Sequence, residues 1–204
     1  MPSIINCRNC IIANDVRSHT VTKKNLSVKW QREIAADNSI AHVVNSFHRR
    51  DGSFSLSRGD IFETNDSYEK VVKAIWWGYP NGMMFHFHEV AIHFSDLTQT
   101  IAPYSGRHLN MPEFESLYDS LSAIMYVGAS TISKLLYFFG IYQDNTQCVI
   151  VDRFVRESMA HYDEFHPVHQ RQPHLWYLEH ARQINEVIID GATPEQVEYF
   201  LFSH

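Results

Sequence analysis

One stretch of the chain brings together residue types that suit chemistry beside a phosphodiester. Gly128 marks a tight turn that leads into an apolar helix, and Ser130, Thr131 and Lys134 follow in the first turns of that helix. The free N–H groups and the positive dipole of a helix N-terminus favour an anion such as a phosphate. Lys134 lies four residues after Ser130 on the same face, where its amine could reach a second phosphate or a reaction centre.

Asp152 is the second candidate for chemistry. It follows Gly128 by 24 residues and comes directly after the apolar run CVIV at 148–151, which we expect to be extended. A carboxylate at the edge of a core is partly desolvated, so it could stabilise a cationic sugar in a transition state and orient water. Each feature has an ordinary interpretation: a capping glycine in an αα-hairpin and an aspartate N-cap. Taken together, they indicate an enzyme that acts on DNA.

The segment WWGYPNG at 76–82 is the third feature. Two tryptophans end a predicted helix, and Tyr79-Pro80-Asn81 forms a stiff loop after them. A rigid loop with a planar or amide side chain can enter a base stack and hold an extruded nucleotide outside the duplex. We therefore predict that Tyr79 and Asn81 contact DNA. The alternative is a core tryptophan pair followed by a routine turn.

Composition limits the class of protein. The 204 residues are 45% hydrophobic and 13% aromatic, which is typical of one well-packed folded domain. The sequence has no apolar run long enough to span a bilayer, and its start lacks the basic and apolar segments of a secretory signal. We therefore expect a cytoplasmic protein without a membrane partner.

The charge is unevenly distributed. The net charge of −6 argues against a nucleic-acid partner, but residues 1–58 contain nine Lys/Arg and only four acidic residues. The remaining residues contain eight Lys/Arg and nineteen acidic residues. A basic N-terminal third can provide a surface that faces phosphates, although solvated lysines explain the same count.

No metal or cofactor is expected from the sequence. Cys7 and Cys10 form a CxxC pair, but no second pair lies at a zinc-site spacing, so we predict reduced thiols. His86 and His93 are seven residues apart rather than the four usual for two ligands on one helix. The connection at 161–174 contains further histidines that could line a base pocket: His161, His166, His169 and His174.

Helical periodicity dominates and predicts an all-α fold in two lobes with a cleft between them. Helices are expected at 26–36, 39–48 (with Ser39 as its cap), 58–62, 67–77, 83–97, 111–124, 153–162, 174–189 and 194–202, and extended segments only at 54–56 and 148–151. We treat 1–204 as a single domain, with a basic helical part at 1–65 and a core at 66–204.

The segments WWGYPNG, VGASTISKLLYFFG and VIVDRFV together resemble the helix–hairpin–helix DNA glycosylases, in particular bacterial proteins with an 8-oxoguanine DNA glycosylase (OGG) fold. The resemblance implies that residues 66–204 form the helix–hairpin–helix core. It also implies that Gly128 grips a phosphate in the hairpin and that Asp152 is the catalytic aspartate. The YPN loop resembles the wedge region that precedes the hairpin in this family.

Two positions depart from the family pattern. Tyr126 stands where the first hairpin glycine is expected. When Thr131 is aligned, Ser130 stands where bifunctional members carry a lysine that forms a Schiff base with the sugar. The resemblance then implies a monofunctional enzyme in which Asp152 works with water. Lys134, one helical turn later, keeps strand cleavage open as an alternative.

The resemblance implies a DNA glycosylase that flips a modified base out of double-stranded DNA and hydrolyses its N-glycosidic bond, leaving an abasic site. Lys134 and Arg153 would assist through their charge. Related small bacterial proteins look like defence enzymes that attack modified bases in phage DNA, so a glucosylated pyrimidine and an oxidised purine (a repair role) are both admissible. No obligatory protein partner is evident. A non-catalytic DNA-binding module and a helical protein-interaction domain remain as alternatives.

Overall fold

The computed structural model describes residues 1–83, 86–187 and 189–204, most of which are helical. This confirms the mainly α class. The described helices are α1 (Arg8–Ile12), α2 (Val28–Ala36), α3 (Asn38–Ser46), α4 (Arg58–Phe62), α5 (Ser67–Gly78), α6 (Phe87–Ala91), α7 (Phe94–Ile101), α8 (Met111–Ser122), α9 (Ala129–Phe138), α10 (Arg153–Met159), α11 (Pro173–Glu186) and α12 (Pro194–Ser203). Short 3-10 turns lie at Ile4–Cys7, Val16–Ser18 and Ala102–Tyr104.

The strands are short and pair segments that are far apart in the chain. β1 (Thr20–Lys23) runs antiparallel to β2 (Phe54–Ser57), which contains the expected extended segment 54–56. β3 (His108–Leu109) lies parallel to β4 (Tyr142–Gln143), which pairs antiparallel with β5 (Thr146–Gln147). The prediction that only 54–56 and 148–151 are extended was wrong, because β1, β3, β4 and β5 also form strands. Residues 148–151 are buried, follow β5 and belong to no strand.

Helix starts follow the capping residues closely. Asp66, Asn110 and Thr193 each accept a backbone N–H at the start of α5, α8 and α12. Ser39 does not cap α3. Asp37 takes that role, because its carboxylate accepts the N–H groups of Ser39 and Ile40.

Several expected helices differ in extent, three of them most clearly. The helix predicted at 83–97 is interrupted: α6 ends at Ala91 and α7 begins at Phe94. Residues 84–85 of that prediction lie outside the described residues. The helix expected at 153–162 ends earlier, at Met159, and the one expected at 174–189 ends at Glu186.

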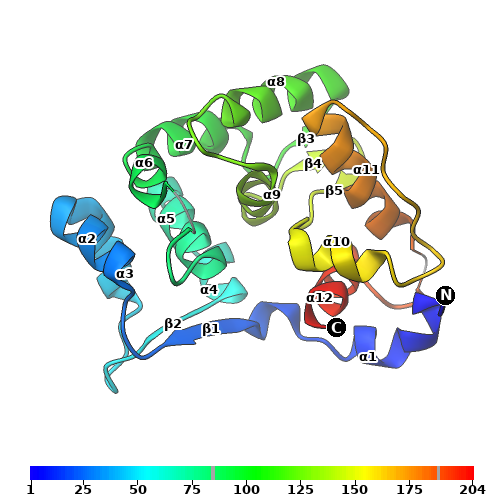
Figure 1. The fold of residues 1–204 in the computed structure, drawn as a ribbon, viewed down its shortest axis with the longest axis horizontal. Helices are drawn as coiled ribbons and strands as arrows, with labels where there is room; N and C mark the ends of the chain where they lie inside the picture. The colour runs from blue at the N-terminus through cyan, green and yellow to red at the C-terminus, as the bar shows by residue number, and fades with distance from the viewer. Residues whose placement is uncertain (84–85, 188) are drawn as a thin grey trace.

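The helix after Gly128 forms the centre of the fold. In Figure 1, α9 lies in the middle of the molecule, and it packs against α5, α8 and α11. Its residues 131–138 are all buried, including the polar Ser133 and Lys134. A helix that is buried on every side must satisfy its polar groups within the protein. The contacts made by Lys134 therefore contribute to the stability of the fold as well as to the candidate site.

A buried ion pair joins two helices that are distant in sequence. Both nitrogens of the Arg58 guanidinium fork donate to Glu198, at 2.6 and 3.2 Å, and both side chains are fully shielded from solvent. The rings of Trp77 and Tyr199 flank the guanidinium, with centroids 4.9 and 5.4 Å from its central carbon. This pair fixes α4 against α12.

We expect Glu198→Gln to lower the free energy of unfolding by about 3–5 kcal/mol, because the variant leaves a buried guanidinium without a counter-charge. Glu157→Gln is the control, since it breaks the exposed Arg153–Glu157 pair. That change should cost less than about 1 kcal/mol. Urea unfolding measures both variants. Equal losses would show that the buried pair contributes no more than a surface pair.

Candidate active site on helix α9

The turn before α9 has the shape of a hairpin but places its strained residue at an unexpected position. Tyr126 adopts the left-handed region, with φ of 64°. The resemblance places a glycine at this position, and glycine is the residue that adopts a positive φ at least cost. Gly128 itself is extended, with φ of −95° and ψ of 171°, and it is the N-cap residue of α9. A methyl group added at Gly128 would meet no atom within 4 Å. The fold therefore does not require glycine there.

The backbone at the start of α9 has donors to offer. Gly128 is exposed, and its carbonyl accepts the N–H groups of Thr131 and Ile132 at 2.9 and 3.0 Å. The first N–H groups of a helix have no partner inside the helix. Those of Ala129 and Ser130 bond to no other group of the described chain. An anion could bind here, and the predicted phosphate contact at Gly128 remains a prediction.

Lys134 connects the start of α9 to Asp152. Its ammonium donates to the Ser130 hydroxyl at 2.9 Å and lies 3.7 Å from a carboxylate oxygen of Asp152. Only 4% of the Lys134 side chain and 12% of the Asp152 side chain are exposed. The structure thus brings Ser130, Lys134 and Asp152 together, although 18 residues separate the lysine from the aspartate.

Asp152 has two contacts, one for each carboxylate oxygen. Oδ1 accepts the N–H of Val155 at 3.1 Å, which makes Asp152 the N-cap of α10. Oδ2 faces Lys134. The ordinary interpretation of this aspartate as a cap is therefore correct, and it does not compete with a chemical role. Capping fixes the carboxylate in a single orientation beside the amine.

Tyr79 belongs to this site as well. Its hydroxyl donates to Ser130 and lies 3.2 Å from the Thr131 hydroxyl. The Lys134 ammonium lies 5.1 Å from the centre of the Tyr79 ring, a cation–π contact. The hydroxyls of Ser130 and Thr131 therefore already have partners inside the protein.

The other predicted DNA contacts lie at the surface. Asn81 is exposed in the turn after α5. The Arg153 side chain is 76% exposed and pairs with Glu157 at 2.7 Å. The described contacts do not join either residue to Lys134 or Asp152.

Gly78 is a site residue that the sequence analysis took only as the end of a helix. A methyl group at this position would lie 2.6 Å from Cδ of Lys134, so the glycine leaves room for the lysine stem. In the sequence, Gly78 is recognisable only as a glycine in the last turn of a helix, directly before Tyr79. That position is common for a helix stop, so nothing in the sequence pointed to a contact with α9.

The buried Arg58–Glu198 pair adds charge next to the site. Burial raises the pKa of Glu198, Arg58 lowers it, and the nearby Asp152 carboxylate raises it again. α9 also takes part, because Arg58 donates to the hydroxyl of Tyr137, one helical turn after Lys134, at 3.4 Å. Two cations and two carboxylates therefore occupy one buried region. The sequence analysis missed Arg58 and Glu198 because burial of a charge leaves no local pattern.

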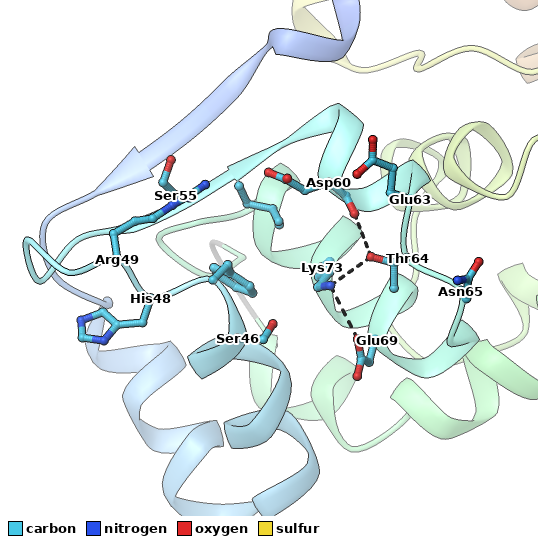
Figure 2. Close-up of a pocket in the computed structure, with 12 residues that line it drawn as sticks. Ser46, His48, Arg49, Ser55, Asp60, Glu63, Thr64, Asn65, Glu69 and Lys73 are labelled. Atoms are coloured by element: carbon cyan, nitrogen blue, oxygen red, sulfur yellow. Dashed lines mark hydrogen bonds and ion pairs between the residues drawn. The ribbon is translucent and has the colours of Figure 1, made fainter.

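A polar pocket lies elsewhere, between β2, α4 and the start of α5, and its volume is about 450 Å³. Figure 2 shows that some of its lining side chains interact with one another: Lys73 donates to Thr64 and forms an ion pair with Glu69. Asp60 closes the capping box of α4 with Ser57. None of the predicted site residues lines this pocket.

The three cysteines are free thiols. Burial raises the pKa of Cys148 to about 12, which keeps that thiol protonated and unreactive. None of the described helices is both long and apolar enough to cross a bilayer.

A family model matches most of the chain. The model of the family described as "Putative 8-oxoguanine DNA glycosylase OGG-like protein" matches residues 14–202. No curated protein matches the chain. No solved structure matches it either.

The double contact of Asp152 predicts different stabilities for two substitutions. Asparagine caps a helix about as well as aspartate, whereas alanine does not. Both variants remove the negative charge beside Lys134, so this loss cancels in the comparison. Asp152→Ala should be less stable than Asp152→Asn by about 1 kcal/mol in urea unfolding. Equal stabilities would show that the cap contributes nothing to α10.

Proposed function

The chain belongs to the OGG-like 8-oxoguanine DNA glycosylase family, and we propose that it is a DNA glycosylase that flips out a modified base and cleaves its N-glycosidic bond. The observation that carries this proposal is the contact between Lys134 and Asp152 beside the N-terminus of α9. This contact places a carboxylate and an amine beside backbone N–H groups that could bind a phosphate.

The first step is departure of the base from C1′ of its sugar. Positive charge then develops on the sugar, and a fixed carboxylate stabilises it most effectively where water is largely excluded. Asp152 meets both conditions, because its cap contact orients it and its side chain is only 12% exposed. The same carboxylate can hold the water that attacks C1′ to complete hydrolysis. An abasic site is the product.

The start of α9 would hold the phosphate next to the flipped nucleotide. The unpaired N–H groups there and the helix dipole favour an anion. Gly128 leaves space for the backbone of DNA to approach. Tyr79 and Asn81 would fill the gap in the duplex, and Arg153 would add a positive charge at the surface. Because the Tyr79 hydroxyl already bonds to α9 and Asn81 is exposed, Asn81 is the more available of the two loop side chains for contact with DNA.

A second mechanism is supported by the position of Lys134. A neutral amine can attack C1′ directly, displace the base and form a Schiff base with the opened sugar, after which the DNA strand is cleaved. Asp152 lies 3.7 Å from the amine, which is beyond hydrogen-bond distance, so a proton would pass between them through one water or after the two groups move closer. This is the alternative to the monofunctional enzyme implied by aligning Thr131.

The modified base defines the biological role. We propose an enlarged pyrimidine such as a glucosylated one, in phage DNA, as the substrate of a defence enzyme. An oxidised purine would instead make the protein a repair enzyme. Both proposals rest on the family resemblance.

Asp152→Asn is the direct test of catalysis, because the amide keeps the α10 cap. We expect it to lower the rate of base release by at least about a hundredfold, the scale of losing a fixed electrostatic contact. The assay incubates DNA duplexes carrying glucosylated, otherwise enlarged or oxidised bases and then detects alkali-labile sites. Asp190→Asn, which changes a carboxylate that is 99% exposed, is the matched control.

The same assay separates the mechanisms and the alternatives. If Lys134 is the nucleophile, sodium borohydride should trap a covalent protein–DNA adduct, and Lys134→Met should abolish that adduct. If water is the nucleophile, no adduct should form. Wild-type base release by Asp152→Asn would refute the role of Asp152. DNA binding without base release on any substrate would favour a non-catalytic binding module.

Gly128→Ala tests the phosphate contact separately from the fold. The added methyl group has no protein neighbour within 4 Å and the backbone φ suits alanine, so the unfolding midpoint should hardly change. A DNA backbone that approaches closely would instead meet the methyl group, and affinity for an abasic-site duplex should fall about tenfold, or about 1.4 kcal/mol. Fluorescence anisotropy measures the affinity. Unchanged affinity would place the phosphate elsewhere.

A further inference from the structure

A cluster of potential metal ligands lies between α8 and α11. Glu115 and Asp119 are four residues apart on α8, so they share a face, and His174 lies in the first turn of α11. One ligand atom from each of the three residues lies within 4.8 Å of the other two. No site residue of the proposed glycosylase takes part.

His174 distinguishes this cluster from an ordinary group of surface acids. It is only 5% exposed, yet its ring nitrogens donate or accept no hydrogen bond among the described residues. Nε2 lies 3.6 Å from Glu115 Oε1, and Nδ1 lies 3.9 Å from Asp119 Oδ1. A buried imidazole usually has a hydrogen-bond partner. Here both nitrogens face carboxylates at distances beyond a hydrogen bond.

These distances suit a bridging ion. Zn²⁺ binds imidazole nitrogen and carboxylate oxygen at about 2.0–2.2 Å, so tetrahedral ligand atoms are about 3.5 Å apart. The 3.6 Å separation of His174 and Glu115 already fits. A single ion binds only one ring nitrogen. With the ion on Nε2, Asp119, which faces Nδ1, must rotate its 64% exposed side chain toward the ion. The exposed side of the cluster leaves the fourth position to water.

We propose that Glu115, Asp119 and His174 form a binding site for one divalent transition-metal ion of the Zn²⁺ type. The ion would tie α8 to the first turn of α11. It would thereby fix the end of the connection 160–172, which contains no helix or strand. The site lies outside the proposed catalytic centre, so its role is structural. The sequence analysis searched for cysteine and histidine pairs at zinc spacings, and so did not consider two carboxylates whose histidine follows 55 residues after Asp119.

The competing explanation is a protonated histidine held by two carboxylates. Such an ion pair would stabilise the protein at acidic pH without any metal. A metal site behaves in the opposite way, because the ligand nitrogen must be deprotonated. Measurements with added Zn²⁺ at neutral pH therefore separate the two.

The experiment uses the untagged full-length chain with Cys7→Ser and Cys10→Ser, which remove the CxxC pair as a competing Zn²⁺ ligand. Isothermal titration with Zn²⁺ should give one ion per chain, and the unfolding temperature should rise with Zn²⁺ concentration. Glu115→Gln with Asp119→Asn should abolish both effects, and His174→Gln should do the same. Glu186→Gln with Asp190→Asn makes the same charge change at exposed positions and should leave binding unchanged.

Several outcomes would overturn the proposal. One is the absence of Zn²⁺ binding in the chain with Cys7→Ser and Cys10→Ser, and another is binding that survives the Glu115 and Asp119 substitutions. Stabilisation that appears only at acidic pH and is independent of Zn²⁺ would identify the ion pair instead. The carboxylate variants keep these tests valid if His174→Gln fails to fold, because Glu115 and Asp119 lie at the surface.

Discussion

The ammonium of Lys134 and the carboxylate of Asp152 lie 3.7 Å apart in surroundings that exclude most water. A buried charge is tolerated only beside an opposite charge and good hydrogen-bond partners. This condition fixes the position of α10 relative to α9. It also explains the neighbours of the pair: Gly78 leaves room for the lysine stem, and the Tyr79 ring covers its charge.

The same helix extends the constraint to the C-terminal part of the chain. Tyr137 of α9 contacts Arg58, which is held by Glu198 of α12. The central helix therefore touches two buried ion pairs, and α4, α10 and α12 are positioned by charge as well as by apolar packing. An enzyme gains from such an arrangement because its carboxylate is already oriented when the substrate arrives, so little reorganisation is needed during the reaction.

The sequence revealed the parts of this arrangement that depend on local patterns. Helical periodicity and the caps Asp66 and Asn110 determine the structure of residues only a few positions away, so the sequence shows them directly. Asp152 stood out because it follows an apolar run. The Arg58–Glu198 pair could not be predicted, since 140 residues separate its members and neither belongs to a motif. The same limit hid the pairing of β1 with β2.

We propose that a flipped nucleotide reaches Asp152 and Lys134 while its phosphate binds at the start of α9. A crystal structure of Asp152→Asn bound to a duplex with an abasic-site analogue tests it most directly. We expect C1′ of the analogue within about 4 Å of the side chains at 134 and 152, close to a reactive distance, and a phosphate on the N–H groups that follow Gly128. An analogue bound at another surface, with this site still closed by protein, would contradict the account.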